Sequence, residues 1–262
     1  MPRLAAIDVG SNAMRLAIAS ADDDGKMRVI ETSREPVRLG ADVFSDGEIS
    51  DARLVEAMEA FLKFRKIINK YKVKEVRAVG TSALREARNR DYCIRQVAKT
   101  TEIAIDVISA EEEARLAFLA VSRAVKLQGK TALLVDVGGG SVEASLANET
   151  EILSTDSFGT GTVRLLQMLN ERKQEDRVFR QLAREYINVS GTRLRKSIGE
   201  RTVDVCVATG GNVESIGDLR VQLCDADDDR SARQRTEDRM SHSVAVHERG
   251  LRDIRACIVI GL

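Results

Sequence analysis

Several kinds of residue are scarce in this sequence of 262 residues, and each scarcity disfavours a class of function. The two histidines, His242 and His247, lie in a polar stretch near the C-terminus, which argues against a serine–histidine catalytic triad. The four cysteines are far apart and lack the close spacing of zinc ligands, so we expect reduced thiols and no zinc site. A Walker-type Gly-Lys-Ser/Thr loop is also absent from the sequence.

Charge and hydropathy narrow the range of partners. Lysine plus arginine number 41, and aspartate plus glutamate number 41, so no net charge attracts nucleic acid or an anionic membrane. The longest apolar runs are shorter than the roughly 18 residues that a membrane span requires, and no charged and then apolar leader precedes the first expected strand. We therefore expect a cytoplasmic protein without nucleic-acid or membrane partners, in which any polyanionic ligand is attracted locally.

A short glycine turn occurs twice, 128 residues apart. Each copy follows an apolar run that ends in aspartate and precedes alternating residues, a pattern typical of strand, tight turn and strand. Backbone N–H groups, a small hydroxyl and a carboxylate are the parts that hold phosphate oxygens and a divalent cation. The repeat predicts a duplicated fold with two phosphate-type turns facing each other. The copies are Asp8-Val9-Gly10-Ser11-Asn12 and Asp136-Val137-Gly138-Gly139-Gly140-Ser141.

The same order of elements is expected in each half, with a boundary near residues 128–130 that gives domains of residues 1–128 and 129–262. Expected strands cover residues 4–9, 13–19, 27–37, 75–79, 103–108, 131–136, 142–147, 152–157, 203–208 and 258–262. Helices are expected after Ser50, from Ser109, after Gly161 and over residues 175–196. The apolar stripe expected on the helix after Ser50 contains Leu54, Val55, Met58, Phe61, Leu62 and Ile68.

The helix from Ser109 carries a carboxylate on its apolar side. Ser109 and Glu112 have the spacing of a capping box, which gives Glu112 a structural role. Because successive residues rotate by about 100° around a helix, Glu113 shares a face with Leu116, Ala117, Ala120 and Ala124. A carboxylate in this position is either a poised general base or the partner of an arginine such as Arg85.

Three further carboxylates are candidate site residues because of their positions on the expected strands. Asp8 and Asp136 end buried strands, and Mg²⁺ held through waters would relieve the cost of burying their charge. Glu143 alternates with apolar neighbours and therefore projects to the polar face of its strand, beside Ser141 and Ser145. Glu143 either helps to place metal or water or is an ordinary exposed strand residue.

The ordered series of motifs resembles that of the exopolyphosphatase / guanosine pentaphosphate phosphohydrolase (Ppx/GppA) phosphatase family over residues 4–223. The resemblance implies an α/β fold, namely the duplicated actin-like (ribonuclease H-like) two-domain fold of the sugar kinase, Hsp70 and actin superfamily. It also implies Mg²⁺-dependent (or Mn²⁺-dependent) release of orthophosphate from polyphosphate or from guanosine pentaphosphate, a nucleotide of the stringent response, and a homodimer. The motifs are Asp8-Val9-Gly10-Ser11-Asn12 with Arg15, Gly80-Thr81-Ser82-Ala83-Leu84-Arg85-Glu86-Ala87, Ile108-Ser109-Ala110-Glu111-Glu112-Glu113-Ala114-Arg115-Leu116, Asp136-Val137-Gly138-Gly139-Gly140-Ser141 with Glu143, and Thr209-Gly210-Gly211-Asn212.

Site residues follow from the resemblance, motif by motif. Glu113 matches the base that activates water, and Asp136 and Glu143 match carboxylates that position metal and water. The expected metal site consists of Asp8, Asp136 and Glu143. The expected phosphate-binding residues are Gly10, Ser11, Asn12, Arg15, Arg85, Gly138, Gly139, Gly140, Ser141, Gly210 and Gly211.

The chain departs from the family pattern near its end. Ala110 stands where the family usually has glycine. From about residue 224 the segment is atypical or incomplete, because residues 225–250 are rich in Asp, Arg and Ser and lack helical periodicity. An alternative function is therefore a non-catalytic module that binds polyphosphate or guanosine tetraphosphate. A kinase on the same scaffold is disfavoured, since the motifs around Glu113 and Arg85 are hydrolase-like.

Overall fold

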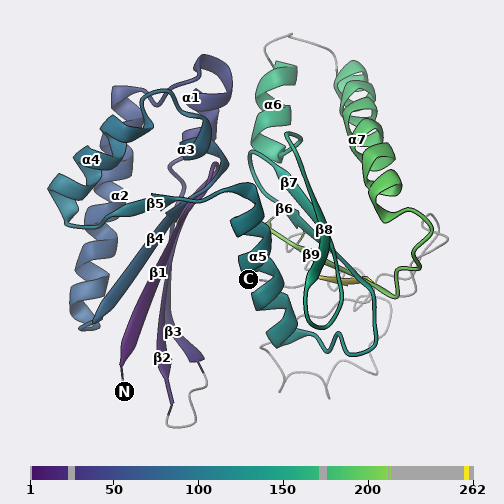
Figure 1. Cartoon of the computed structure of the whole chain (residues 1–262). Helices are drawn as coiled ribbons and strands as arrows, with labels where there is room; N and C mark the ends of the chain where they lie inside the picture. Colours follow the sequence, from purple (N-terminus) through teal and green to yellow (C-terminus); the bar gives the residue numbers. More distant parts are fainter. Residues whose placement is uncertain (1, 23–26, 171–175, 212, 214–256, 260–262) are drawn as a thin grey trace, which may run out of the picture. The chain divides into compact units, whose positions relative to one another are not determined.

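The computed structural model describes residues 2–22, 27–170, 176–211, 213 and 257–259 (Figure 1). The chain forms two compact units. Unit 1 contains Met1–Ala110 and Thr162–Phe179, and unit 2 contains Glu111–Gly161 and Arg180–Leu262. Each unit is built on one five-stranded sheet.

The sheet of unit 1 has the order β3-β2-β1-β4-β5. The first three strands pair antiparallel as consecutive hairpins, whereas β4 pairs parallel to β1 and β5 parallel to β4. Alternation of apolar and polar residues fixes which face of β1 and β2 is buried. The strands are β1 Arg3–Val9, β2 Met14–Ala21, β3 Met27–Glu35, β4 Glu75–Gly80 and β5 Ile105–Val107.

The sheet of unit 2 repeats this order as β10-β9-β6-β7-β8. Strands β6, β7 and β8 pair antiparallel, and β9 pairs parallel to β6 and to β10. The tail predicted to be atypical lies outside the described residues, apart from β10. The strands are β6 Ala132–Val137, β7 Val142–Ala147, β8 Ile152–Phe158, β9 Val205–Thr209 and β10 Cys257–Val259.

The duplication predicted from the glycine turns is confirmed at the level of register. Asp8 lies opposite Arg15 in the first hairpin, and Asp136 lies opposite Glu143 in the second, so both pairs are related by the same shift of 128 residues. The turn hydrogen bonds also correspond. The Gly10 amide donates to the Ala13 carbonyl at 3.2 Å, as the Gly138 amide donates to the Ser141 carbonyl at 3.0 Å.

Most helices of unit 1 pack with its strands in one apolar core. Helix α2 begins where predicted, since the Ser50 hydroxyl accepts a hydrogen bond from the Arg53 amide at 3.2 Å. Helix α6 follows β8 in the chain, yet it packs against α1 and belongs to unit 1. The helices are α1 Leu39–Asp46, α2 Asp51–Lys70, α3 Ser82–Glu86, α4 Arg90–Thr101 and α6 Thr162–Asn170.

The predicted apolar stripe of α2 is partly wrong. Val55 and Leu62 are 49% and 41% exposed, although they were expected in the stripe. Small residues take part in the true contact face, because alanines let the helix approach the sheet closely while the larger side chains fill the space beside them. The buried face consists of Leu54, Ala57, Ala60, Phe61, Phe64 and Ile68.

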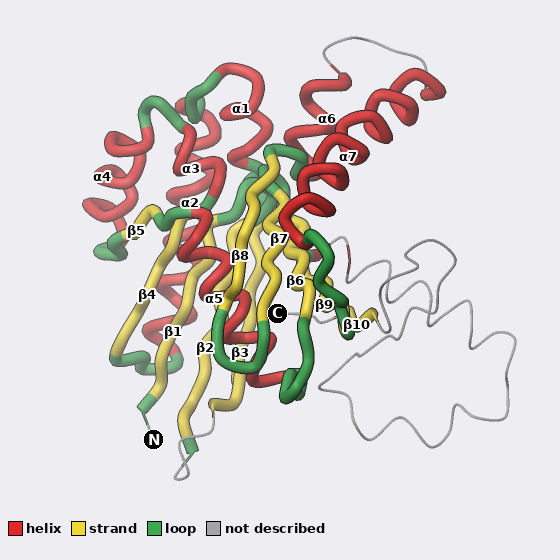
Figure 2. Tube along the Cα trace, turned by 45° about the vertical axis from the view of Figure 1, so that its right-hand side comes forward, coloured by secondary structure: helices red, strands yellow, loops and turns green. Residues whose placement is uncertain are grey.

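Unit 2 has a helix on each face of its sheet (Figure 2). On one face, Phe118 and Val121 of α5 (Ala110–Ala124) form a cluster with strand residues that include Leu134. On the other face, Leu194 and Ile198 of α7 (Asp176–Ile198) pack around a second cluster. None of the helices in the described part of the chain is both long and apolar enough to cross a membrane.

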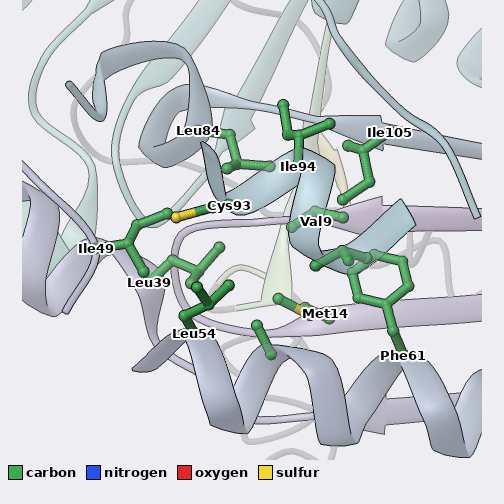
Figure 3. A pocket seen from close by; sticks show the side chains of 12 residues that line it. Val9, Met14, Leu39, Ile49, Leu54, Phe61, Leu84, Cys93, Ile94 and Ile105 are labelled. Carbon is green, nitrogen blue, oxygen red and sulfur yellow. The ribbon is translucent and has the colours of Figure 1, made fainter. Parts of the chain in front are cut away.

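The core of unit 1 contains a small apolar pocket (Figure 3). Its lining includes Val9 from β1, Met14 from β2, Phe61 from α2 and Cys93 from α4. Burial raises the pKa of the Cys93 thiol, which favours its neutral form in the core. The pocket therefore has the character of a packing space between sheet and helices.

Truncation of Phe61 tests this packing. Phe61 is fully buried, whereas its neighbour Leu62 is 41% exposed. We expect Phe61→Ala to lower the free energy of unfolding by about 3–5 kcal/mol, because a cavity replaces the ring. Leu62→Ala, the matched control, should change it by less than about 1 kcal/mol. Chemical denaturation followed by circular dichroism measures both, and equal effects would contradict the described helix face.

Candidate active site

The first glycine turn is tied to a second predicted motif in unit 1. Ser11 and Ser82 are 4% and 2% exposed, and their hydroxyl oxygens lie 3.4 Å apart. Ser82 is the first residue of α3 and directly follows the Gly80-Thr81 turn. The structure thus brings the β1–β2 turn next to the end of β4, as the parallel pairing of β1 with β4 requires.

Arg15 lies on the face of β2 opposite its buried apolar residues. Met14, Leu16 and Ile18 are almost completely buried, while Arg15 is on the opposite, half-buried face. Asp8 is its cross-strand neighbour in the β1–β2 pairing. Opposite charges at facing positions of two strands favour the pairing, so Asp8 and Arg15 share one face of this sheet.

Arg85 is held by the loop before α5. Its Nη1 donates a hydrogen bond to the Ile108 carbonyl at 2.8 Å, and the side chain is partly buried. This bond positions the guanidinium between α3 and the segment that follows β5. The alternative in which Arg85 pairs with Glu113 stays a prediction.

The paired carboxylates of unit 2 lie on adjacent strands. Asp136 at the end of β6 faces Glu143 near the start of β7. Glu143 is 3% exposed, and its Oε1 accepts a hydrogen bond from the Ser157 hydroxyl at 3.1 Å. The alternative in which Glu143 is an ordinary exposed strand residue is therefore wrong. The alternation along β7 does not by itself show that Glu143 is buried, and the side chain lies beside Ser157 of the neighbouring strand β8.

Glu113 lies toward the end of the unit 2 sheet that carries Asp136, on the face to which the Asp136 side chain projects. Asp136 shares its face with Leu134, since side chains two residues apart on a strand point the same way, and Leu134 packs with Phe118 of α5. A short connection joins the end of α5 to the start of β6, so α5 runs back along the sheet (Figure 1). The first turn of α5, which carries Glu113, therefore lies toward the end of β6 that carries Asp136.

The expected position of Glu113 within the apolar stripe of α5 needs correction. The buried residues of this helix are Ala114, Phe118 and Val121, and Leu116 is 38% exposed. Glu113 is half-buried and borders this stripe. The bulky Phe118 and the β-branched Val121 determine which face packs on the sheet, whereas the helical wheel favoured the more numerous alanines.

The neighbouring Glu112 has a different environment. Its carboxylate accepts two hydrogen bonds from Arg115, at 2.6 and 2.7 Å. These hydrogen bonds lower the pKa of Glu112, because they stabilise its charged form. A carboxylate paired in this way is a poor general base. The capping box with Ser109 stays a prediction.

The glycine-rich turn of unit 2 depends on a glycine that sequence reasoning did not assign to the site. The Gly161 amide donates to the Gly140 carbonyl at 3.3 Å. A Cβ on Gly161 would lie closer to backbone atoms of Gly139, Gly140 and Ser141 than real Cβ atoms come. The sequence signal is the Gly159-Thr160-Gly161-Thr162 run, which by itself indicates only the start of a helix.

A second glycine approaches the same turn from β9. Gly210 has a φ of +105°, and a Cβ there would collide with the Val137 carbonyl and lie 3.2 Å from the Asp136 Oδ1 atom. The predicted Gly210-Gly211 turn thus adjoins the end of β6. Its backbone conformation and its close contact both require glycine.

Asp136 and Glu143 are facing carboxylates of the kind that can hold a divalent cation, and this role stays a prediction. Mg²⁺ in proteins commonly takes one or two carboxylates, completing its shell with water and substrate phosphates. Within the described ranges, three or more acidic, histidine or cysteine side chains do not gather into a metal-binding cluster. Asp8 belongs to unit 1, and its metal role stays a prediction.

Sequence comparison identifies relatives of this chain. The model of the Ppx/GppA phosphatase family matches residues 18–223. The chain is 35% identical over 170 residues to a bifunctional 3-dehydroquinate synthase/phosphatase of Fusobacterium nucleatum, covering 62% of this chain and 26% of that protein. It is 32% identical over 161 residues to exopolyphosphatase 1 of Mycobacterium tuberculosis, covering 61% and 47%. These matches thus span less than half of the curated relatives' length.

A solved structure supports the same relationship. An exopolyphosphatase from Cytophaga hutchinsonii superposes with a TM-score of 0.78 at 28% sequence identity, covering 85% of this chain and 71% of that one. The predicted fold class, a duplicated actin-like α/β fold, is therefore confirmed.

Alanine at Gly161 tests the contact that shapes the turn. We expect Gly161→Ala to lower the free energy of unfolding by about 1–3 kcal/mol or more. The added Cβ would overlap backbone atoms, which cannot move aside as a flexible side chain could. Gly191→Ala in α7 is the control. It has nothing within 4 Å of the added Cβ and should stabilise the helix by about 0.5–1 kcal/mol. Denaturant unfolding measures both, and a neutral Gly161→Ala would contradict the close packing.

Proposed function

Because the chain belongs to the Ppx/GppA phosphatase family, we propose that it is a phosphohydrolase that releases terminal orthophosphate from inorganic polyphosphate or guanosine pentaphosphate. The observation that carries the proposal is the arrangement in unit 2. Glu113 lies toward the end of the sheet where Asp136 and Glu143 face each other, beside the glycine-rich turn. The names of the Fusobacterium, Mycobacterium and Cytophaga relatives support a phosphatase and polyphosphate as a substrate.

In the proposed reaction, Glu113 accepts a proton from the attacking water. The water oxygen forms a bond to the terminal phosphorus, and the bond between that phosphorus and the bridging oxygen breaks. The products are orthophosphate and a chain or nucleotide shortened by one phosphate. A half-buried carboxylate suits the role of base, because it is reachable by water and is incompletely solvated.

In the proposed reaction, the backbone N–H groups of the glycine turns bind the negatively charged phosphates. Residues Gly138–Ser141 combine a run without side chains with buried positions at Gly140 and Ser141, so backbone N–H groups can approach phosphate oxygens closely. Arg15 and Arg85, with the equivalent turn at Gly10–Asn12, are the proposed phosphate-binding groups of unit 1. Phosphoryl transfer needs mainly positioning and charge stabilisation of this kind.

Asp136 and Glu143 are the carboxylates that we propose to hold Mg²⁺ or Mn²⁺. When bound, the cation neutralises charge on the phosphoryl oxygens. Ser157 keeps the Glu143 carboxylate in place through its hydrogen bond, so the Glu143 side chain is oriented by the fold itself. Asp8, which lies near the end of the equivalent strand β1, is proposed as a further metal residue.

The alternative function is a module that binds polyphosphate or guanosine tetraphosphate without turnover. Phosphate release from long-chain polyphosphate and from guanosine pentaphosphate separates the two proposals. Release from either substrate supports the hydrolase and identifies the preferred one. Tight binding of both ligands without release would support the binding module instead.

Removal of the proposed base should abolish most of the activity. We expect Glu113→Gln to reduce kcat about 100-fold or more, because the amide cannot accept the proton from water. Glu112→Gln is the matched control, one residue away and paired with Arg115, and it should retain kcat within about threefold. Phosphate release measures both, and full turnover by Glu113→Gln would remove Glu113 from the mechanism.

Metal removal should abolish turnover, and this tests the proposed metal site independently of Glu113. We expect EDTA to reduce turnover to background and added Mg²⁺ or Mn²⁺ to restore it. Asp136→Asn should raise the Mg²⁺ concentration for half-maximal rate by about tenfold or more, because one charged oxygen ligand is lost. Titration of activity against Mg²⁺ measures the shift. An unchanged titration would argue against Asp136 as a ligand.

A further inference from the structure

Four polar residues form a row across the sheet of unit 2. Thr209 in β9 pairs with Asp136 in β6, and Asp136 pairs with Glu143 in β7. Glu143 in turn pairs with Ser157 in β8. Because directly paired residues of neighbouring strands project to the same face of a sheet, all four side chains lie on one face. This polar row thus combines the two proposed metal carboxylates with a hydroxyl group at each end.

The polar row lies where the apolar core of this face ends. Two residues before Thr209 on β9 is Val207, which is buried in the cluster formed with α5. Leu134 has the same relation to Asp136 on β6. On the other side of the row, Gly210 follows Thr209 and packs on the backbone at the end of β6. Thr209 therefore lies between packed aliphatic side chains and the glycine-rich turn of the proposed site.

Thr209 carries a buried hydroxyl group. The residue is 2% exposed, and its hydroxyl makes no hydrogen bond within the described part of the chain. The same holds, among the described residues, for the buried hydroxyl of Ser141 in the glycine-rich turn. By contrast, the Ser145 hydroxyl lies 2.8 Å from that of Thr155, and the Thr101 hydroxyl donates to a carbonyl of its own helix at 2.8 Å. Buried hydroxyls that lack a protein partner bind ordered water or a ligand, and these two lie at the same end of the sheet.

The neighbouring carboxylate selects the kind of molecule that Thr209 can bind. An ionised carboxylate only accepts hydrogen bonds, so a molecule that joins it to a hydroxyl must donate to it. An ionised phosphate oxygen has no proton to donate, whereas water donates two hydrogen bonds and also accepts. Buried waters in proteins typically make about three hydrogen bonds to polar groups of this kind.

We propose that Thr209 is a positioning residue, whose hydroxyl holds a water molecule against the Asp136 carboxylate. In the proposed reaction, this water fixes the direction of the carboxylate relative to the substrate phosphates. Small displacements of groups that align a transferred phosphoryl group are costly, so loss of the hydroxyl acts mainly on kcat. The kinetic consequence rests on the proposed function, whereas the bound water does not.

Kinetics of three variants test the role of the hydroxyl. We expect Thr209→Val, which replaces the hydroxyl by a methyl group, to lower kcat about tenfold or more with KM changed by less than about threefold. Thr209→Ser restores the hydroxyl and should recover most of kcat. Thr101→Val is the matched control, because Thr101 is equally buried in unit 1, and it should leave kcat unchanged. Wild-type kcat in Thr209→Val, or no recovery in Thr209→Ser, would overturn the positioning role.

A high-resolution crystal structure of the wild-type protein tests the water directly and requires no variant to fold. We expect an ordered water within about 3.2 Å of both the Thr209 Oγ1 atom and an Asp136 carboxylate oxygen. The same water should be missing from the structure of Thr209→Val. A wild-type Thr209 hydroxyl bonded only to protein atoms would overturn the proposal. If the wild type releases no phosphate from either substrate, the proposed function fails, and the crystal structure still decides whether Thr209 holds the water.

Discussion

The proposed site depends on close contact between backbone segments that carry no side chains. Gly161 and Gly210 come from different parts of the chain, and each meets the β6–β7 turn or the strand before it at a distance that excludes a Cβ. Because these contacts are between backbone atoms, they cannot relax by a change of rotamer. The turn is therefore held in one shape, with its amide groups fixed relative to Asp136 and Glu143.

Much of the fold could be predicted because the two halves of the sequence carry related turns that can be compared with each other. Two turns that share Asp-Val-Gly, 128 residues apart, predicted two hairpins with the same register, and the Asp8–Arg15 and Asp136–Glu143 pairings confirm this. The period-two alternation of residues along β2 matches its buried face, and the serine cap expected at Ser50 begins α2. These features depend on local sequence. Local sequence preferences predict the structure correctly where tertiary packing favours the same conformation.

The remaining features depend on neighbours that are distant in sequence. The buried face of α5 was misjudged because Phe118 and Val121 fit the opposing sheet, and a helical wheel contains no information about that sheet. Glu143 is buried and accepts a hydrogen bond from Ser157 of the neighbouring strand β8, although its own strand pattern is compatible with exposure. Gly161 was missed because its constraint comes from the Gly139–Ser141 backbone, about twenty residues earlier.

Helix α6 shows that the repeats in the sequence are not the units of packing. It follows β8 of unit 2 in the chain and packs on α1 of unit 1. A first repeat expressed alone would lack this helix, exposing the apolar ring of Phe44 that Arg164 covers. A substitution of Phe44 on α1 is therefore expected to disturb the packing of α6, although α6 lies more than one hundred residues later in the chain.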